Sequence, residues 1–93
     1  MSVITLERNH QLSIEELTSV LNELIAKLES KLDVKSYWES DRELYFRRSG
    51  ANGHIEFDDS QLTLTVKLGL MFRALKGPIE REITEVVDKY LEV

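Results

Sequence analysis

The segment Leu62-Thr63-Leu64-Thr65-Val66-Lys67-Leu68 alternates strictly between apolar and polar side chains. Such alternation is typical of a β-strand with one face in the core and the other in water. The period of two extends back to Val34, through further short strands separated by polar turns. Strands joined by short turns form an antiparallel meander. Residues 34–68 therefore predict an antiparallel sheet with one apolar face.

The turns between these strands are marked by polar residues and glycine. We expect strands over Val34–Glu39 and Leu44–Arg48, and a third around Ile55 and Phe57. Within the run Gly50-Ala51-Asn52-Gly53, the Asn-Gly pair predicts the hairpin turn, because both residues accept a positive φ. A further turn is expected at 58–61, before the alternating segment.

Helices are predicted on both sides of the meander. Ser13 and Glu16 form a capping-box pattern, and apolar residues at steps of three and four follow from about Ile14 to Leu32. A short strand around Ile4 precedes this helix, and a polar stretch joins the two. After residue 68 we expect a short helix over 69–76, a break at Gly77-Pro78 and a longer amphipathic helix.

These elements predict an α+β fold in the order β-α-β-β-β-β-α, with the helices packed on one face of an antiparallel sheet. The chain has 93 residues, of which 42% are hydrophobic, so we expect residues 1–93 to form a single domain. It carries 12 basic and 17 acidic residues, and its net charge is −5. Cysteine is absent, which excludes disulfides, thiolate metal sites and cysteine nucleophiles.

Nucleic-acid binding is disfavoured by the acidic balance, although Arg42, Arg47 and Arg48 cluster around Tyr45 on one predicted hairpin. The N-terminus lacks the basic and apolar regions of a signal peptide, and no apolar run reaches the ~20 residues of a membrane span. We therefore expect a cytoplasmic protein that neither spans a membrane nor binds nucleic acid.

Enzymatic chemistry also finds little support. His10 and His54 are far apart in the sequence, and Asp58-Asp59 reads as a polar turn rather than as a cation site. Ser49 lies near His54, but no nucleophile elbow, P-loop or dinucleotide fingerprint is present. We expect no catalytic residues, no metal and no cofactor.

One apolar segment, Leu68 to Leu75, exceeds what a connection between a strand and a helix requires. On a short α-helix, residues 70, 71, 74 and 75 would share one face and pack on the sheet, while Phe72 would point outward. The alternative is that the whole segment is a buried corner of the core. An exposed apolar patch ringed by charge marks a surface for a partner or an interface. The candidate binding residues are Leu70, Met71, Phe72, Arg73, Leu75 and Lys76.

The run from Lys67 to Ile83, with Leu75-Lys76-Gly77-Pro78-Ile79-Glu80 at its centre, resembles the C-terminal signature of the polyhydroxyalkanoic acid system (granule-region) family of small bacterial proteins. Further similarity lies in Arg8–Leu12, in Tyr37-Trp38 and in Phe46–Gly50, so the resemblance covers nearly the whole chain. It implies an association with the storage of polyhydroxyalkanoate, a bacterial polyester, at the granule surface. It implies no known reaction.

Three functions remain open at this point. The segment 68–75 could adsorb to the polyester granule, or it could dock on another granule protein. Alternatively, the protein is a homodimer or a protein-interaction module that uses the same apolar segment, an exposed edge of the sheet, or the free face of the sheet with Tyr37, Tyr45, Thr63 and Thr65. A third possibility is a small binder of a hydroxyacyl chain or its thioester between helix and sheet, with Arg47, Arg48 or Lys67 holding the acidic end.

Overall fold

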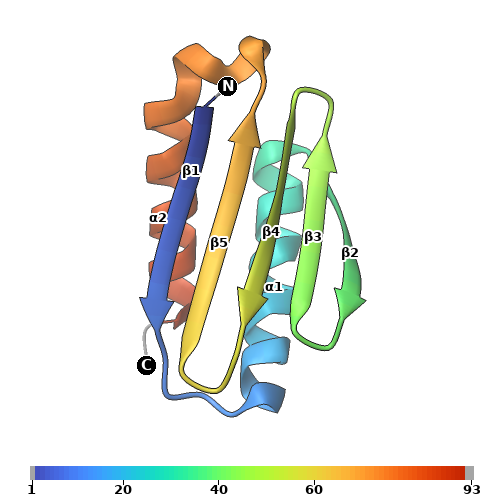
Figure 1. Ribbon diagram of the computed structural model, residues 1–93, viewed down its shortest axis with the longest axis vertical. Coiled ribbons are helices and arrows are strands. Elements are labelled where there is room, and N and C mark those ends of the chain that lie inside the picture. The colour runs from blue at the N-terminus through green and yellow to red at the C-terminus, as the bar shows by residue number, and fades with distance from the viewer. Residues whose placement is uncertain (1, 92–93) are drawn as a thin grey trace.

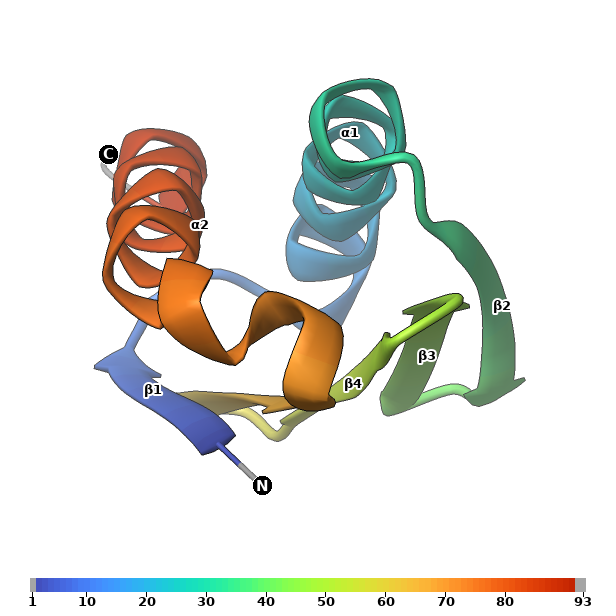
Figure 2. The ribbon, with the colours of Figure 1, turned by 90° about the horizontal axis from the view of Figure 1, so that it is seen from above.

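The computed structural model describes residues 2–91, and this part of the chain folds into a sheet covered by helices (Figure 1). The elements are β1 (Ser2–Asn9), α1 (Ile14–Leu32), β2 (Lys35–Ser40), β3 (Glu43–Arg48), β4 (Ala51–Phe57), β5 (Gln61–Leu68), the 3₁₀ helix η1 (Leu70–Leu75) and α2 (Lys76–Leu91). The strands form one antiparallel sheet in the order β1-β5-β4-β3-β2. Both main helices lie on the same face of this sheet (Figure 2). The predicted α+β class and element order are confirmed.

Strand β5 joins the N-terminal strand to the rest of the sheet. It pairs with β4, its neighbour in the chain, and also with the distant β1. Its side chains alternate as predicted, and Leu62, Leu64, Val66 and Leu68 are all buried against the helices. Since β1 and β2 are the two edges of the sheet, the chain has to cross the buried face between them, and α1 lies along the strands behind that face (Figure 1).

Helix α1 begins with the predicted capping box. The Ser13 side chain accepts a hydrogen bond from the Glu16 N–H at 3.1 Å, and the Ser13 N–H donates to the Glu16 carboxylate at 3.0 Å. These hydrogen bonds stabilise the ionised form and lower the pKa of Glu16. The apolar stripe that follows, Leu17, Leu21, Leu24, Ile25 and Leu28, is buried against the sheet. Each such side chain contributes about 1.5–3 kcal/mol through its burial.

The predicted position of the hairpin turn is wrong. The turn between β3 and β4 is made by Ser49 and Gly50, and Gly50 has a φ of 88°. Asn52 and Gly53 instead lie inside β4, where they pair with Arg47 and Phe46. A two-residue turn at 49–50 keeps the alternation of β3 in register with that of β4. Turning at Asn52-Gly53 would remove Gly53 from beneath the Phe46 ring.

Gly53 is required at its position by close packing. A Cβ atom there would lie 2.6 Å from the backbone oxygen of Thr65 and 2.8 Å from the ring of Phe46. The ring of Phe46 is buried and covers the space that a side chain would occupy. The absence of a side chain, rather than conformational freedom, explains this glycine.

Two other boundaries differ from the predictions by more than a single residue. Strand β1 runs to Asn9 rather than ending near Leu6, because each of its residues pairs with β5. Helix α2 begins at Lys76 and contains Gly77 and Pro78, with no break before them. Pro78 lies in the first turn, where its missing N–H has no helical acceptor to lose.

The glycines provide a matched test of the packing. We expect Gly53→Ala to lower the free energy of unfolding by about 1–3 kcal/mol, because the methyl group collides with Phe46 and with the β5 backbone. Gly77→Ala should leave stability unchanged or raise it by up to about 1 kcal/mol, since a Cβ there has no neighbour within 4 Å. Urea unfolding of both variants makes the comparison. Equal stabilities would contradict the proposed packing of Phe46 over Gly53.

Candidate functional site

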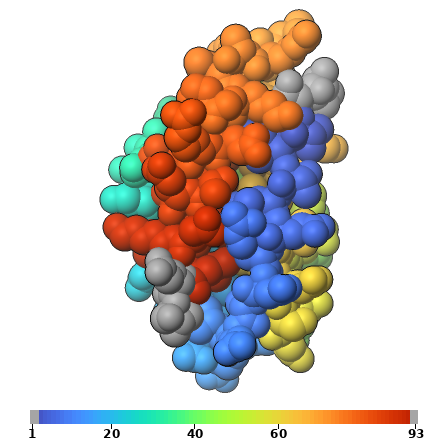
Figure 3. All heavy atoms as spheres, turned by 90° about the vertical axis from the view of Figure 1, so that its left-hand side faces the viewer, coloured from blue at the N-terminus to red at the C-terminus, as the bar shows by residue number. Residues whose placement is uncertain are grey.

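The 3₁₀ helix η1 carries the most exposed large apolar side chains of the described chain. The exposed fractions are 81% for Leu70, 67% for Met71 and 48% for Leu75. We call these three side chains the cap. The cap lies at one end of the long axis of the molecule (Figures 1 and 3). Of the two charged candidates in this segment, Arg73 is exposed and Lys76 is half-buried. The cap is thus an apolar surface with basic residues beside it, not a buried corner of the core.

Phe72 points inward, so the predicted orientation of the segment is reversed. Its ring packs against the core and lies 4.7 Å from the guanidinium carbon of Arg48. The physical reason is the type of helix. A 3₁₀ helix has three residues per turn, so within its first turn Phe72 faces the core while Leu70 and Met71 turn to the outside. Leu75, one turn after Phe72, lies where η1 meets α2 and is 48% exposed. The 3.6-residue period assumed from the sequence grouped these residues differently.

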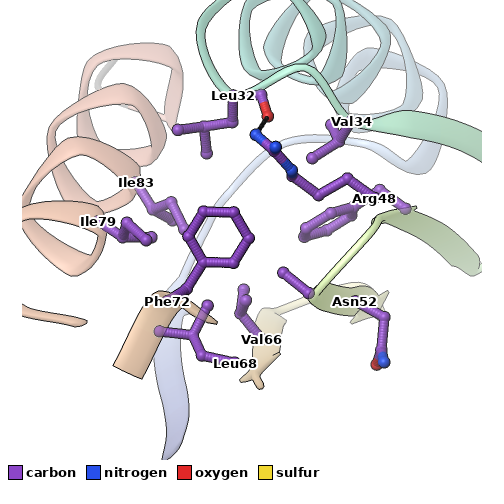
Figure 4. A pocket seen from close by; sticks show the side chains of 11 residues that line it. Leu32, Val34, Arg48, Asn52, Val66, Leu68, Phe72, Ile79 and Ile83 are labelled. Atoms are coloured by element: carbon purple, nitrogen blue, oxygen red, sulfur yellow. Dashed lines mark hydrogen bonds between the residues drawn. The ribbon is translucent and has the colours of Figure 1, made fainter. Parts of the chain in front are cut away.

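Beneath Phe72 lies a small apolar cavity of about 50 Å³ (Figure 4). It is formed where α1 ends, α2 begins and the sheet comes closest to η1. Its walls include Val34, Val66, Leu68, Ile79 and Ile83, with Phe72 between them. An apolar cavity of about 150 Å³ accommodates benzene, so this cavity suits a fragment of about two or three carbon atoms.

Arg48 connects the elements around the cavity. Its Nη1 donates a hydrogen bond of 2.9 Å to the backbone oxygen of Leu32 at the end of α1, where the helix dipole favours a cation. Its guanidinium plane lies over the ring of Phe72 (Figure 4). Its Nε atom is buried and has no hydrogen-bond partner among the described residues. Arg48 therefore holds η1 against α1 and keeps one donor unused at the cavity.

The charge of −5 is distributed unevenly along the molecule. The strand register places Lys35, Arg47 and Lys67 in one row across the sheet, next to the end that carries the cap. Glu43 and Glu56 lie in a second row toward the opposite end of the molecule. Burial raises the pKa of Tyr45, and the negative charges of these two carboxylates raise it further. The cap end is therefore basic although the chain as a whole is acidic. Net charge alone did not reveal this.

The two histidines have structural surroundings. The Nε2 atom of His10 lies 2.8 Å from the backbone oxygen of Asp58, and its Nδ1 accepts a hydrogen bond from the N–H of Leu12. His10 thus joins the start of α1 to the β4–β5 turn. The hairpin register sets His54 opposite Tyr45 rather than opposite Ser49, so the structure does not bring the Ser–His pair considered from the sequence together. Within residues 2–91, no group of three or more His, Asp or Glu side chains is arranged to hold a metal ion.

A family model described as "Putative polyhydroxyalkanoic acid system protein" matches residues 4–91. The chain belongs to this family. The match includes β1 from Ile4 onward, the other four strands, both helices, the cap and Arg48, and it confirms the resemblance drawn from the sequence. A comparison with curated proteins and with solved structures finds no match. None of the helices in the described part of this family member is both long and apolar enough to cross a membrane.

Replacing Arg48 tests its connecting role. We expect Arg48→Ala to lower the free energy of unfolding by about 2 kcal/mol, because the hydrogen bond to Leu32 and the contact with Phe72 are both lost. The neighbouring exposed Arg47→Ala should change stability by less than about 0.5 kcal/mol.

Arg48→Lys provides the conservative variant, which retains the charge but lacks the planar fork. Its free energy of unfolding, measured by chemical denaturation, should fall between those of Arg47→Ala and Arg48→Ala. Equal effects of the Arg47 and Arg48 substitutions would show that Arg48 does not connect η1 to α1.

Proposed function

We propose that this protein is a non-catalytic protein of the polyhydroxyalkanoate system that adsorbs to the polyester granule through the cap. The observation that carries the proposal is the exposure of Leu70, Met71 and Leu75 together at the basic end of the molecule. A protein in water gains nothing from exposing three large apolar side chains side by side, and such patches mark surfaces for partners or interfaces. Membership of the polyhydroxyalkanoic acid system family is the reason for proposing polyhydroxyalkanoate as the surface that the cap contacts.

The energetics fit reversible adsorption. Full burial of three such side chains contributes about 4–9 kcal/mol, and part of this is spent on lost translational and rotational freedom. Binding of a single molecule would then be weak and in rapid exchange. Arg73, Lys76 and the basic row beside the cap add attraction to an anionic boundary, including the carboxylate at one end of a polyester chain.

A non-catalytic role is proposed because the separation of Ser49 from His54 leaves the reactive groups considered from the sequence dispersed. Binding requires only the cap and the fold that presents it. We propose that the protein acts in the bacterial cytoplasm at the granule surface, where one end of the molecule meets the polymer and the acidic end faces the surrounding water.

Co-sedimentation with polyhydroxybutyrate granules tests the proposal. The double variant Leu70→Asp/Met71→Asp should reduce the bound fraction at least tenfold, since it places charge on the two most exposed apolar positions. Ala26→Asp adds the same kind of charge at an exposed position of α1 and serves as the matched control. Phe72→Asp is unsuitable because Phe72 packs against the core and its loss would disturb the fold.

Circular dichroism of all variants verifies that they are folded. Unchanged binding of the double variant would contradict adsorption through the cap. A native protein that does not bind bare granules would contradict direct contact with the polymer, and would favour docking of the same cap on another granule protein.

A second candidate function is favoured by the cavity beneath Phe72. A short hydroxyacyl chain could place its alkyl end in this apolar space, with the unused Nε donor of Arg48 near its acidic end. Arg47 and Lys67 flank a shallower depression on the neighbouring surface, outside the cavity, so they fit the acidic end less well than Arg48. The volume of about 50 Å³ restricts the candidate ligands to short chains.

Thermal unfolding with 3-hydroxyhexanoate tests this candidate. At a concentration one hundred times its dissociation constant, a ligand that binds only the folded protein contributes about 2.7 kcal/mol, so Tm should rise by about 10–20 °C for a domain of this size. Ala51→Leu places extra carbon atoms at a wall of the cavity and should abolish the shift. Acetate is the control anion. The same Tm with and without the hydroxyacid at millimolar concentration would rule out this candidate.

A further inference from the structure

The helices leave one face of the sheet uncovered (Figure 2). The strand register arranges the side chains of this bare face in three rows of distinct chemistry. Pairing between neighbouring strands defines each row. The basic row is Lys35, Arg47, Asn52, Lys67 and Val3; the central row is Tyr37, Tyr45, His54, Thr65 and Thr5; the acidic row is Glu43, Glu56, Thr63 and Glu7. The bare face thus changes from positive to negative along the strands, with an aromatic and hydroxyl-bearing row between the two charges.

The rings of the central row are stacked on one another within the single chain, before any partner binds. The rings of Tyr37 and Tyr45 are stacked with centroids 5.8 Å apart, and those of Tyr45 and His54 are stacked at 5.2 Å. Stacking on the neighbouring rings restricts the rotamers of these side chains, so less rotamer freedom remains to be lost on binding. Tyrosines of this kind are enriched at protein interfaces, because they combine apolar area with a polar end.

The charged rows have few partners within the chain. Ion pairs among residues 2–91 join Arg8 to Asp88, Lys31 to Glu82 and His54 to Glu56, and none of them uses Arg47 or Lys67. The central row separates the basic row from the acidic row, and no ion pair within residues 2–91 joins these two charged rows. A second surface that presents the opposite order of charges would pair both of them.

We propose that this face binds a second copy of the same chain, with the two sheets packed face to face about a two-fold axis along the central row. This axis places the basic row of each copy over the acidic row of the other, with Arg47 over Glu43 of β3 in the partner copy. Each central-row residue then faces its own counterpart. A two-fold axis along the strands would instead bring the two basic rows together. Charge complementarity therefore selects both the partner and the orientation.

The area fits a weak dimer. Strands about 4.8 Å apart and rows about 6.8 Å apart give a face of roughly 500 Å² per copy once side chains are included. Two such faces bury at most roughly 1,000 Å², the lower limit for a specific interface, because β2 curls toward α1 at the rim (Figure 2). The contact is therefore centred on β3, β4 and β5 and falls in the size range of weak, transient complexes. We expect reversible association at micromolar concentrations or above.

Charge reversal of each row tests the dimer. In one variant, Glu43→Lys and Glu56→Lys make both charged rows basic and change the net charge from −5 to −1. In the other, Arg47→Glu and Lys67→Glu make both rows acidic and change the net charge from −5 to −9. Each variant alone should associate at least tenfold more weakly than the native protein. An equimolar mixture should regain a dimer, although both components carry net negative charge.

Sedimentation velocity from about 5 to about 500 µM covers the expected range of association. The mixed dimer should weaken in 0.5 M salt, since screening reduces the attraction between the rows. The proposal is overturned by a native protein that stays monomeric, by variants that dimerise as well as the native protein, or by a mixture that stays monomeric. Ala26→Asp, on the helical side, should leave association unchanged. None of these measurements involves polymer, so they are independent of the cap.

Discussion

One-sided burial of the sheet is the constraint on which the rest of this structure depends. Alternation along β5 sends Leu62, Leu64, Val66 and Leu68 to one face, and α1 and α2 supply just enough apolar surface to cover that face. Within residues 2–91, both main helices lie on this face and none of the helices covers the other (Figure 2). The outer face is therefore made of hydroxyl, aromatic and charged side chains, whose arrangement is free to serve contacts with other molecules.

The same constraint explains the cap. Strand β5 ends at Leu68 and α2 begins at Lys76, so residues 69–75 connect the sheet to the helices that cover it. Helix η1 makes this passage with one inward side chain, Phe72, which closes the cavity and stacks on Arg48. The other large apolar side chains of η1, Leu70, Met71 and Leu75, do not reach the core. Their exposure gives one end of the molecule a chemical character that the rest of its surface lacks.

The cap and the bare face are separate surfaces, and they present different chemistry. The cap is apolar and flexible in its side chains, which suits a surface without fixed detail, such as a polymer. The bare face carries ordered rings and alternating charge, which suits a partner of defined shape. The two proposals can therefore fail independently. A protein that used both would carry one polymer-binding end per copy, directed along the strands, in a dimer held by the sheets.

The local sequence determines some elements of this structure but not others. Local patterns determined the α+β class, the strand β5, the capping box at Ser13 and the amphipathic stripe of α1, because each depends on residues a few positions apart. The family was also recognisable, since the run around Leu75–Glu80 is specific. The hairpin turn was misplaced, because the role of Gly53 depends on a contact with Phe46 that no local pattern records.

The candidate site was located by sequence, but only the tertiary structure decided how it is built. The excess of apolar residues in 68–75 marked the segment, whereas the 3₁₀ geometry of η1 decided that Phe72 turns inward and that Leu70 and Met71 turn outward. Arg48 and the three rows of the bare face depend on strand register, which joins residues far apart in the chain. Composition and periodicity determine which strands and helices have one apolar and one polar face. Packing and register decide which side chains meet on them.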